Sequence, residues 1–123
     1  MKLRSVITAL VALGALPQFA AAAGGGNIRL QTDGTYEHKT VTYDCASAGR
    51  IKVTYVNADP NFLAIVPVKG QKQDLIFASV ISGSGARYAA GKFIWWNKGK
   101  NSDLYDSTLG DNAPPVMSCT QAD

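Results

Sequence analysis

The chain has 123 residues, of which 46% are hydrophobic and 17% charged, and its formal net charge is +3. This length accommodates one domain. Lys2 and Arg4 precede an apolar N-terminal run, and without them ten basic residues oppose nine acidic ones. Because these charges nearly balance and form no run of like sign, we expect no binding of nucleic acid, which requires a clustered basic face.

The N-terminal region has the pattern of a signal peptide. A basic start is followed by an apolar run over residues 5–16, which is too short to span a bilayer, and Pro17 ends that run. Small residues up to Ala23 then offer a cleavage site. We expect residues 1–23 to be removed on export and residues 24–123 to form the mature domain. No cysteine lies near this junction to accept a lipid, so the sequence predicts a periplasmic protein without a membrane anchor.

Hydrophobic residues after this segment alternate with period 2, as in half-buried strands. Residues 40–45 place Val41, Tyr43 and Cys45 on one face, and residues 50–55 repeat the pattern after a turn at Ala48-Gly49. Together with the turn residues between the apolar runs, this alternation predicts strands at residues 40–45, 50–55, 62–68, 74–81, 86–90, 92–97, 103–106 and 116–119.

About eight short strands with close spacing are typical of an antiparallel sandwich or a closed barrel. Closure removes the exposed strand edges that would otherwise promote aggregation, and one small core suffices to fill a barrel of this size. The sequence therefore predicts an all-β fold, a small antiparallel β-barrel of about eight strands.

Cys45 and Cys119 are the two cysteines of the chain. In an oxidising compartment such a pair predicts a disulfide, which would join the C-terminal tail to an early strand. The alternative is a catalytic or metal-binding thiol pair. That alternative is disfavoured because the spacing is not C-x-x-C and His38 is the single histidine.

The sequence offers no constellation typical of an enzyme. A serine hydrolase needs a base beside its nucleophile, and His38 lies between Glu37 and Lys39 in the pattern of a solvated strand edge. No cluster of His, Cys and carboxylate residues has the spacing of a metal site. The Gly-Ser run at residues 82–85 lacks the lysine of a phosphate-binding loop. We therefore expect neither enzymatic activity nor a metal or cofactor.

Two neighbouring segments stand out as candidates for a binding site. In the first, Ser84 lies between Gly83 and Gly85, and Arg87-Tyr88 follows. A hydroxyl between glycines can approach a partner closely because no neighbouring side chain obstructs it.

The second segment is the strand at residues 92–97 with the turn that follows it. Alternation places Phe93 and Trp95 on one face and Trp96 on the other, so one tryptophan belongs to the core and the other is a candidate for the surface. Lys98 and Gly99 come directly after this strand. In isolation, this pattern is more typical of an ordinary solvated turn than of a binding site.

The two segments, S-G-A-R-Y and W-W-x-K-G-x-x-x-x-L, resemble the paired motifs of the bacterial inhibitors of c-type lysozyme, and the lack of a lipid-accepting cysteine resembles the soluble periplasmic branch. The resemblance implies an eight-stranded barrel that inserts two loops into the lysozyme cleft. Ser84 and Lys98 would point toward the catalytic carboxylates, and Arg87 and Tyr88 would shape or support the first loop. Ser102 departs from the family pattern, which has alanine there. The residues assigned to lysozyme binding on this basis are Gly83, Ser84, Gly85, Arg87, Tyr88, Trp96, Lys98 and Gly99.

This resemblance predicts a protein partner, a c-type lysozyme of the host, against which the inhibitor would protect peptidoglycan. A homodimer is an alternative to the monomer. A periplasmic module that binds glycan or peptidoglycan through an exposed tryptophan is a second hypothesis, and a structural barrel with a role in assembly is a third. The polar residues near Trp96 are Ser84, Asn97 and Lys98, which favour an acidic partner over a glycan.

Overall fold

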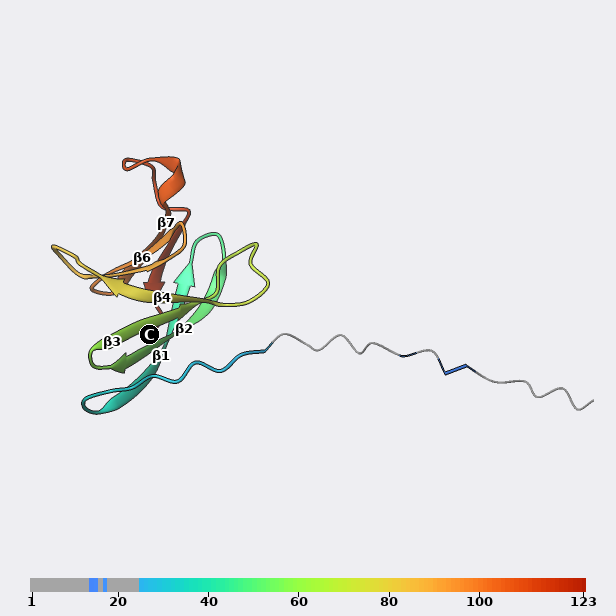
Figure 1. Ribbon diagram of the computed structural model, residues 1–123. Coiled ribbons are helices and arrows are strands. Elements are labelled where there is room, and N and C mark those ends of the chain that lie inside the picture. The colour runs from blue at the N-terminus through green and yellow to red at the C-terminus, as the bar shows by residue number, and fades with distance from the viewer. Residues whose placement is uncertain (1–13, 16, 18–24) are drawn as a thin grey trace, which may run out of the picture.

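The computed structural model describes residues 14, 15, 17 and 25–123. The predicted signal peptide over residues 1–23 therefore lies almost wholly outside the described residues. Residues 25–35 form an arm without regular secondary structure that leads into the first strand. Among the described residues, the strands and the one helical turn all lie after this arm (Figure 1).

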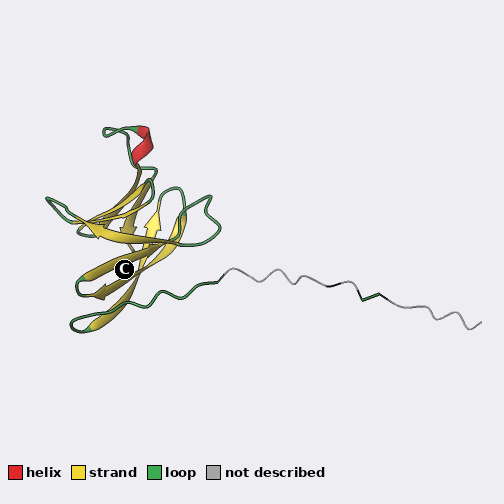
Figure 2. Ribbon diagram, viewed as in Figure 1, coloured by secondary structure: helices red, strands yellow, loops and turns green. Residues whose placement is uncertain are grey.

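Within residues 25–123, eight strands form one closed barrel in which each strand pairs with its neighbours in the chain and β1 pairs with β8. Every pairing is antiparallel. Figure 2 shows a domain of strands joined by loops, with one short helical turn. The elements are β1 (Tyr36–Cys45), β2 (Gly49–Ala58), β3 (Asn61–Val66), β4 (Leu75–Val80), β5 (Ala86–Ala90), β6 (Phe93–Lys98), β7 (Asn101–Asp106), the 3₁₀ turn η1 (Ser107–Leu109) and β8 (Met117–Gln121).

The predicted fold class is confirmed, and the strand bounds differ most at β2, which continues to Ala58, and at β1. This strand begins at Tyr36, four residues before the predicted start, because its polar first half pairs with β2 as far as Tyr36 opposite Ala58. Backbone hydrogen bonds are enough to pair these polar residues with β2. Because they show no hydrophobic alternation, the sequence pattern did not predict this part of the strand. β3 ends at Val66, before Pro67, which lacks the N–H that a further ladder bond requires.

The core consists of the side chains that alternate into the barrel. Trp95, Tyr43, Phe77, Leu104 and Val53 are the largest of them that are almost completely buried. Full burial of one large apolar side chain contributes about 1.5–3 kcal/mol to folding. The prediction that one of the two tryptophans belongs to the core is thus met by Trp95.

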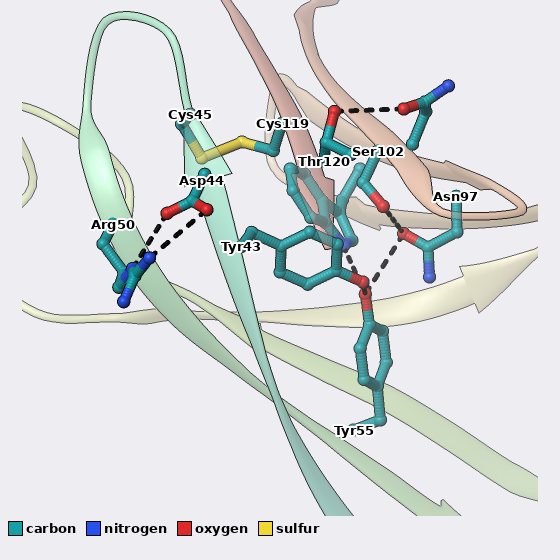
Figure 3. Close-up of a disulfide and its surroundings, with 11 residues drawn as sticks. Tyr43, Asp44, Cys45, Arg50, Tyr55, Asn97, Ser102, Cys119 and Thr120 are labelled. Carbon is teal, nitrogen blue, oxygen red and sulfur yellow. Dashed lines mark hydrogen bonds and ion pairs between the residues drawn. A yellow bond between two sulfur atoms is a disulfide. The ribbon is translucent and has the colours of Figure 1, made fainter. Parts of the chain in front are cut away.

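The predicted disulfide between Cys45 and Cys119 is confirmed. It joins β1 to β8 at residues that are directly opposite in the sheet, with a Cα–Cα distance of 4.1 Å (Figure 3). The bond therefore lies where the first and last strands close the barrel, and it links positions 74 residues apart. In the chain-entropy model, a loop of this length stabilises the folded state by about 4 kcal/mol.

Asp106 organises the connection between β7 and β8. Its carboxylate caps η1 by accepting hydrogen bonds from Thr108, and it pairs with the Lys92 ammonium at 2.7 Å. The hydrogen bond from Lys92, followed by those from Thr108, lowers the pKa of Asp106 to about 2. The Asp106 side chain is 10% exposed, so water screens this pair less than an ordinary surface pair.

We expect Asp106→Asn to lower the melting temperature at pH 7 and to have a shrinking effect as the pH approaches 2. The folded-state pKa lies below the ordinary value of 3.8, so the charge stabilises the fold above about pH 4 and this contribution is lost as the pH falls toward the folded pKa. Asparagine can still cap η1, so the variant tests the contribution of the Asp106 charge alone. Thermal unfolding at several pH values measures the effect, with Asp111→Asn on the same connection as the control. A difference between wild type and variant that stayed constant down to pH 2 would contradict this account.

Candidate functional site

The loop at residues 81–85 and the turn at residues 99–100 lie at the same end of the barrel. They connect β4 to β5 and β6 to β7, and in an antiparallel barrel every second connection returns to the same end. The β2–β3 turn at residues 59–60 shares this end. The η1 segment belongs to the β7–β8 connection at the opposite end, where it projects from the barrel (Figure 1). The two motifs singled out in the sequence are therefore brought together.

The 81–85 loop packs directly on β6. Gly85 has a φ of 63°, and a Cβ at this position would lie 2.0 Å from the carbonyl oxygen of Asn97 and 3.3 Å from Nε1 of Trp96. Both its conformation and this close approach therefore require glycine. The carbonyl of Ser84 accepts hydrogen bonds from Ser82 Oγ and, at 2.9 Å, from Trp96 Nε1. The Ser84 residue itself is exposed.

The 99–100 turn presents Lys98 at its edge. Lys98 pairs with Asn101 across a two-residue connection, Gly99 has a φ of 62°, and glycine first with a positive φ fits a type II′ hairpin. The exposed Lys98 ammonium lies 3.6 Å from the centroid of the Trp96 ring. No carboxylate of the described residues forms an ion pair with Lys98, whereas Lys100 approaches Asp123 at 3.7 Å.

Arg87 lies beside Trp96 on the outer face of the barrel. The two residues are directly opposite on β5 and β6, and Cζ of Arg87 is 5.0 Å from the indole centroid. The Nε atom of Arg87 is buried and has no hydrogen-bond partner among the described residues. The guanidinium therefore packs against the indole rather than projecting freely into solvent.

Tyr88 is directed into the barrel. It is 8% exposed, and its ring centroid lies 5.8 Å from that of Tyr55. Burial is the main cause that raises the pKa of Tyr88, and the electrostatic interaction with neighbouring Tyr43 raises it further. Gly83 lies in the exposed part of the 81–85 loop, where no atom is close enough to restrict it.

A hydrogen-bond network inside the barrel supports this end of β6, and the sequence analysis missed it. Tyr55 donates to Asn97 Oδ1 at 3.1 Å and accepts from Trp95 Nε1 at 2.9 Å (Figure 3). Because the Tyr55 proton is used in this way, Tyr43 is the donor of the 2.8 Å bond between the two tyrosine hydroxyls. Ser102 donates to Asn97 Oδ1 at 2.9 Å. Burial and the bond with Tyr43 raise the pKa of Tyr55 far above its ordinary value.

The hydrogen bond to Asn97 explains how serine at position 102 can replace the alanine of the family pattern. Ser102 is 1% exposed and is paired with Asn97 across β6 and β7, so its hydroxyl is satisfied inside the barrel. The signal that could have identified this network is alternation: continued to the strand ends, it places both polar residues on the inner face, where a buried polar group needs a partner.

The end of β4 adds an apolar element that the sequence analysis also missed. Ile81, at the start of the 81–85 loop, is 96% exposed, and Val80 beside it is 43% exposed. Apolar side chains next to polar and charged groups are characteristic of protein–protein interfaces. Among the described residues, no group of three or more histidine, cysteine and acidic side chains could hold a metal ion.

Comparison with known proteins gives consistent matches. Residues 43–112 match the model of the family described as membrane-bound lysozyme-inhibitor of c-type lysozyme. A Pseudomonas aeruginosa protein named membrane-bound lysozyme inhibitor of C-type lysozyme is 35% identical over 119 residues, which cover 89% of this chain and 93% of the relative. A Cupriavidus necator protein of the same name is 34% identical over 84 residues, covering 68% of this chain and 66% of the relative.

The crystal structure of Pseudomonas aeruginosa MliC in complex with hen egg white lysozyme also matches. The TM-score is 0.67 at 35% sequence identity, and the alignment covers 81% of this chain and 98% of that chain. The resemblance found in the sequence motifs is therefore confirmed. The relatives are named as inhibitors, which agrees with the expectation that this chain is not an enzyme.

The prediction of a periplasmic protein without a membrane anchor is wrong. The family and both relatives are named membrane-bound. The prediction relied on the absence of a cysteine near Ala23. Within residues 14, 15, 17 and 25–123, no helix has the length and apolar character needed to cross a membrane.

We expect Tyr55→Phe to lower the free energy of unfolding by about 1–3 kcal/mol, because it leaves the buried Trp95 N–H without an acceptor. Chemical denaturation measures the change. The matched control is Tyr36→Phe, which removes a hydroxyl from a residue that is 59% exposed and should alter stability by no more than about 0.5 kcal/mol. Equal stability of Tyr55→Phe and wild type would show that the network does not stabilise this end of the barrel.

Proposed function

The chain belongs to the family of membrane-bound lysozyme inhibitors of c-type lysozyme, and we propose that it inhibits such a lysozyme by inserting the 81–85 loop and the 99–100 turn into the active-site cleft. The observation that carries this proposal is the joint presentation of Ser84 and Lys98. Both are exposed at one end of the barrel, and both are in contact with the same indole, that of Trp96.

The chemistry of the two residues suits the target. Lysozyme cleaves a glycosidic bond with one carboxylic acid and one ionised carboxylate. The Lys98 ammonium supplies hydrogen-bond donors and a positive charge without an acceptor, and the Ser84 hydroxyl can donate to the same groups. Filling the cleft with these groups excludes the substrate, so inhibition requires no reaction on this chain.

The proposed role is to protect peptidoglycan from a host lysozyme. A single barrel carries both loops, so a monomer is sufficient and a homodimer is not required. The encounter with lysozyme takes place outside the cytoplasm, which is consistent with our inference that residues 1–23 direct export.

The alternative of a glycan-binding module receives no support from the position of Trp96. A sugar would have to stack on the indole, but Lys98 and Arg87 lie over this ring, with their charged groups 3.6 and 5.0 Å from its centroid. Occupied in this way, the tryptophan serves as a support for cations rather than as an open stacking surface.

We expect Lys98→Ala to weaken inhibition of hen egg-white lysozyme by about 2–5 kcal/mol, which corresponds to a loss of about 30-fold to several thousand-fold. The variant would leave the carboxylates of the enzyme covered but unpaired. Lys100→Ala is the matched control, because Lys100 is two residues away and faces solvent, and it should cost about 0–1 kcal/mol. Inhibition constants from lysis of bacterial cells measure both. Small, equal losses would mean that positive charge acts only diffusely and that insertion is wrong.

We expect Ser84→Ala to weaken inhibition by about 1.5–3 kcal/mol, through loss of a hydrogen bond to an ionised group. Stability should hardly change because the side chain is exposed and the carbonyl that bonds to Trp96 is retained. The same assay, together with thermal unfolding, checks both statements. An unchanged inhibition constant in the folded variant would remove the Ser84 hydroxyl from the site.

A further inference from the structure

We propose that Trp96 is a positioning residue that holds the 81–85 loop and Lys98 in the arrangement required for inhibition. This inference deepens the proposed function and rests on it. The two segments that carry Ser84 and Lys98 are not consecutive in the chain, and the Trp96 indole contacts both of them.

The first contact fixes the loop. The indole N–H donates to the Ser84 carbonyl at 2.9 Å, close to the point where Gly85 packs on the Asn97 carbonyl. The hydrogen bond is to the backbone, so it orients the peptide that carries the Ser84 side chain and leaves the hydroxyl available to a partner.

The second contact restricts the lysine. A lysine side chain at a turn ordinarily samples many rotamers, and ordering it on binding costs free energy. Here the Lys98 ammonium lies 3.6 Å from the ring centroid, within the range of a cation–π interaction. Arg87 packs against the same indole from β5, with its Nε buried, and thereby limits the movement of the ring itself.

The position of Trp96 separates this role from ordinary core packing. Its neighbour Trp95 is directed inward and is completely buried, whereas Trp96 lies on the outer face of β6 and is half-buried. Tyr105, whose ring centroid is 6.3 Å from that of Trp96, lies on the same outer face. Removing the Trp96 indole therefore empties no part of the barrel interior.

The test is a double-mutant cycle on inhibition of hen egg-white lysozyme by the full domain. Trp96→Leu should weaken inhibition by about 10- to 100-fold, from the combined loss of a cation–π contact and a hydrogen bond. Lys98→Ala should then cost at least about 5-fold less in the Trp96→Leu background than in the wild type, because the lysine is no longer held in place. Tyr105→Leu, on the same face, is the control and should change inhibition by less than about 2-fold.

Trp96→Phe provides a second variant if the leucine variant folds poorly. Phenylalanine keeps a ring beneath Lys98 but cannot donate to the Ser84 carbonyl. It should therefore retain most of the coupling to Lys98 and lose about 2- to 10-fold in inhibition. Circular dichroism and thermal unfolding establish that each variant is folded.

The outcomes distinguish this inference from the proposed function. If the wild-type domain leaves lysozyme active, both are wrong. If the wild type inhibits but Lys98→Ala costs the same in the presence and absence of Trp96, the positioning role alone is overturned. Reduced inhibition with strong non-additivity supports the role, because a merely structural loss would act equally in both backgrounds.

Discussion

Closure of the barrel is the constraint on which the rest of the structure depends. β1 pairs with β2 along its length and with β8 at its end, so the first and last strands complete one continuous sheet. The disulfide between Cys45 and Cys119 lies within this seam and fixes it covalently. Since the strands follow one another in chain order and every pairing is antiparallel, the 81–85 loop and the 99–100 turn share one end.

Closure has a second effect on the interior near the candidate site. A small barrel must be filled by its own side chains, and toward this end the filling becomes polar. Asn97 and Ser102 meet the tyrosine hydroxyls there, and the hydroxyls of Tyr43, Tyr55 and Ser102 and the Asn97 carbonyl oxygen are all hydrogen-bonded (Figure 3). A polar network that is satisfied in this way restricts the β6–β7 hairpin to one geometry. The turn that carries Lys98 therefore rests on a rigid base.

Period-2 alternation was enough to predict the barrel, the inward direction of Val53, and the placement of Trp95 and Trp96 on opposite faces, but not which of the two tryptophans is buried. The paired motifs were enough to identify the family. The sequence did not reveal that the Tyr55 hydroxyl would meet Asn97, 42 positions away, nor that the Trp96 indole would bond to the Ser84 carbonyl. Such contacts depend on strand register and rotamers, which alternation does not specify. The start of β1 was missed because its polar residues pair through backbone alone.

The arm at residues 25–35 is attached next to the two loops and leaves them accessible. It joins β1 at the end of the barrel that carries the two loops, and a side-chain bond from Asn61 to the Gln31 carbonyl fastens it there. From this point the arm turns and runs back, away from the loops (Figure 1). Ser84 and Lys98 stay exposed beside this attachment point, so the arm leaves both side chains accessible to an approaching protein.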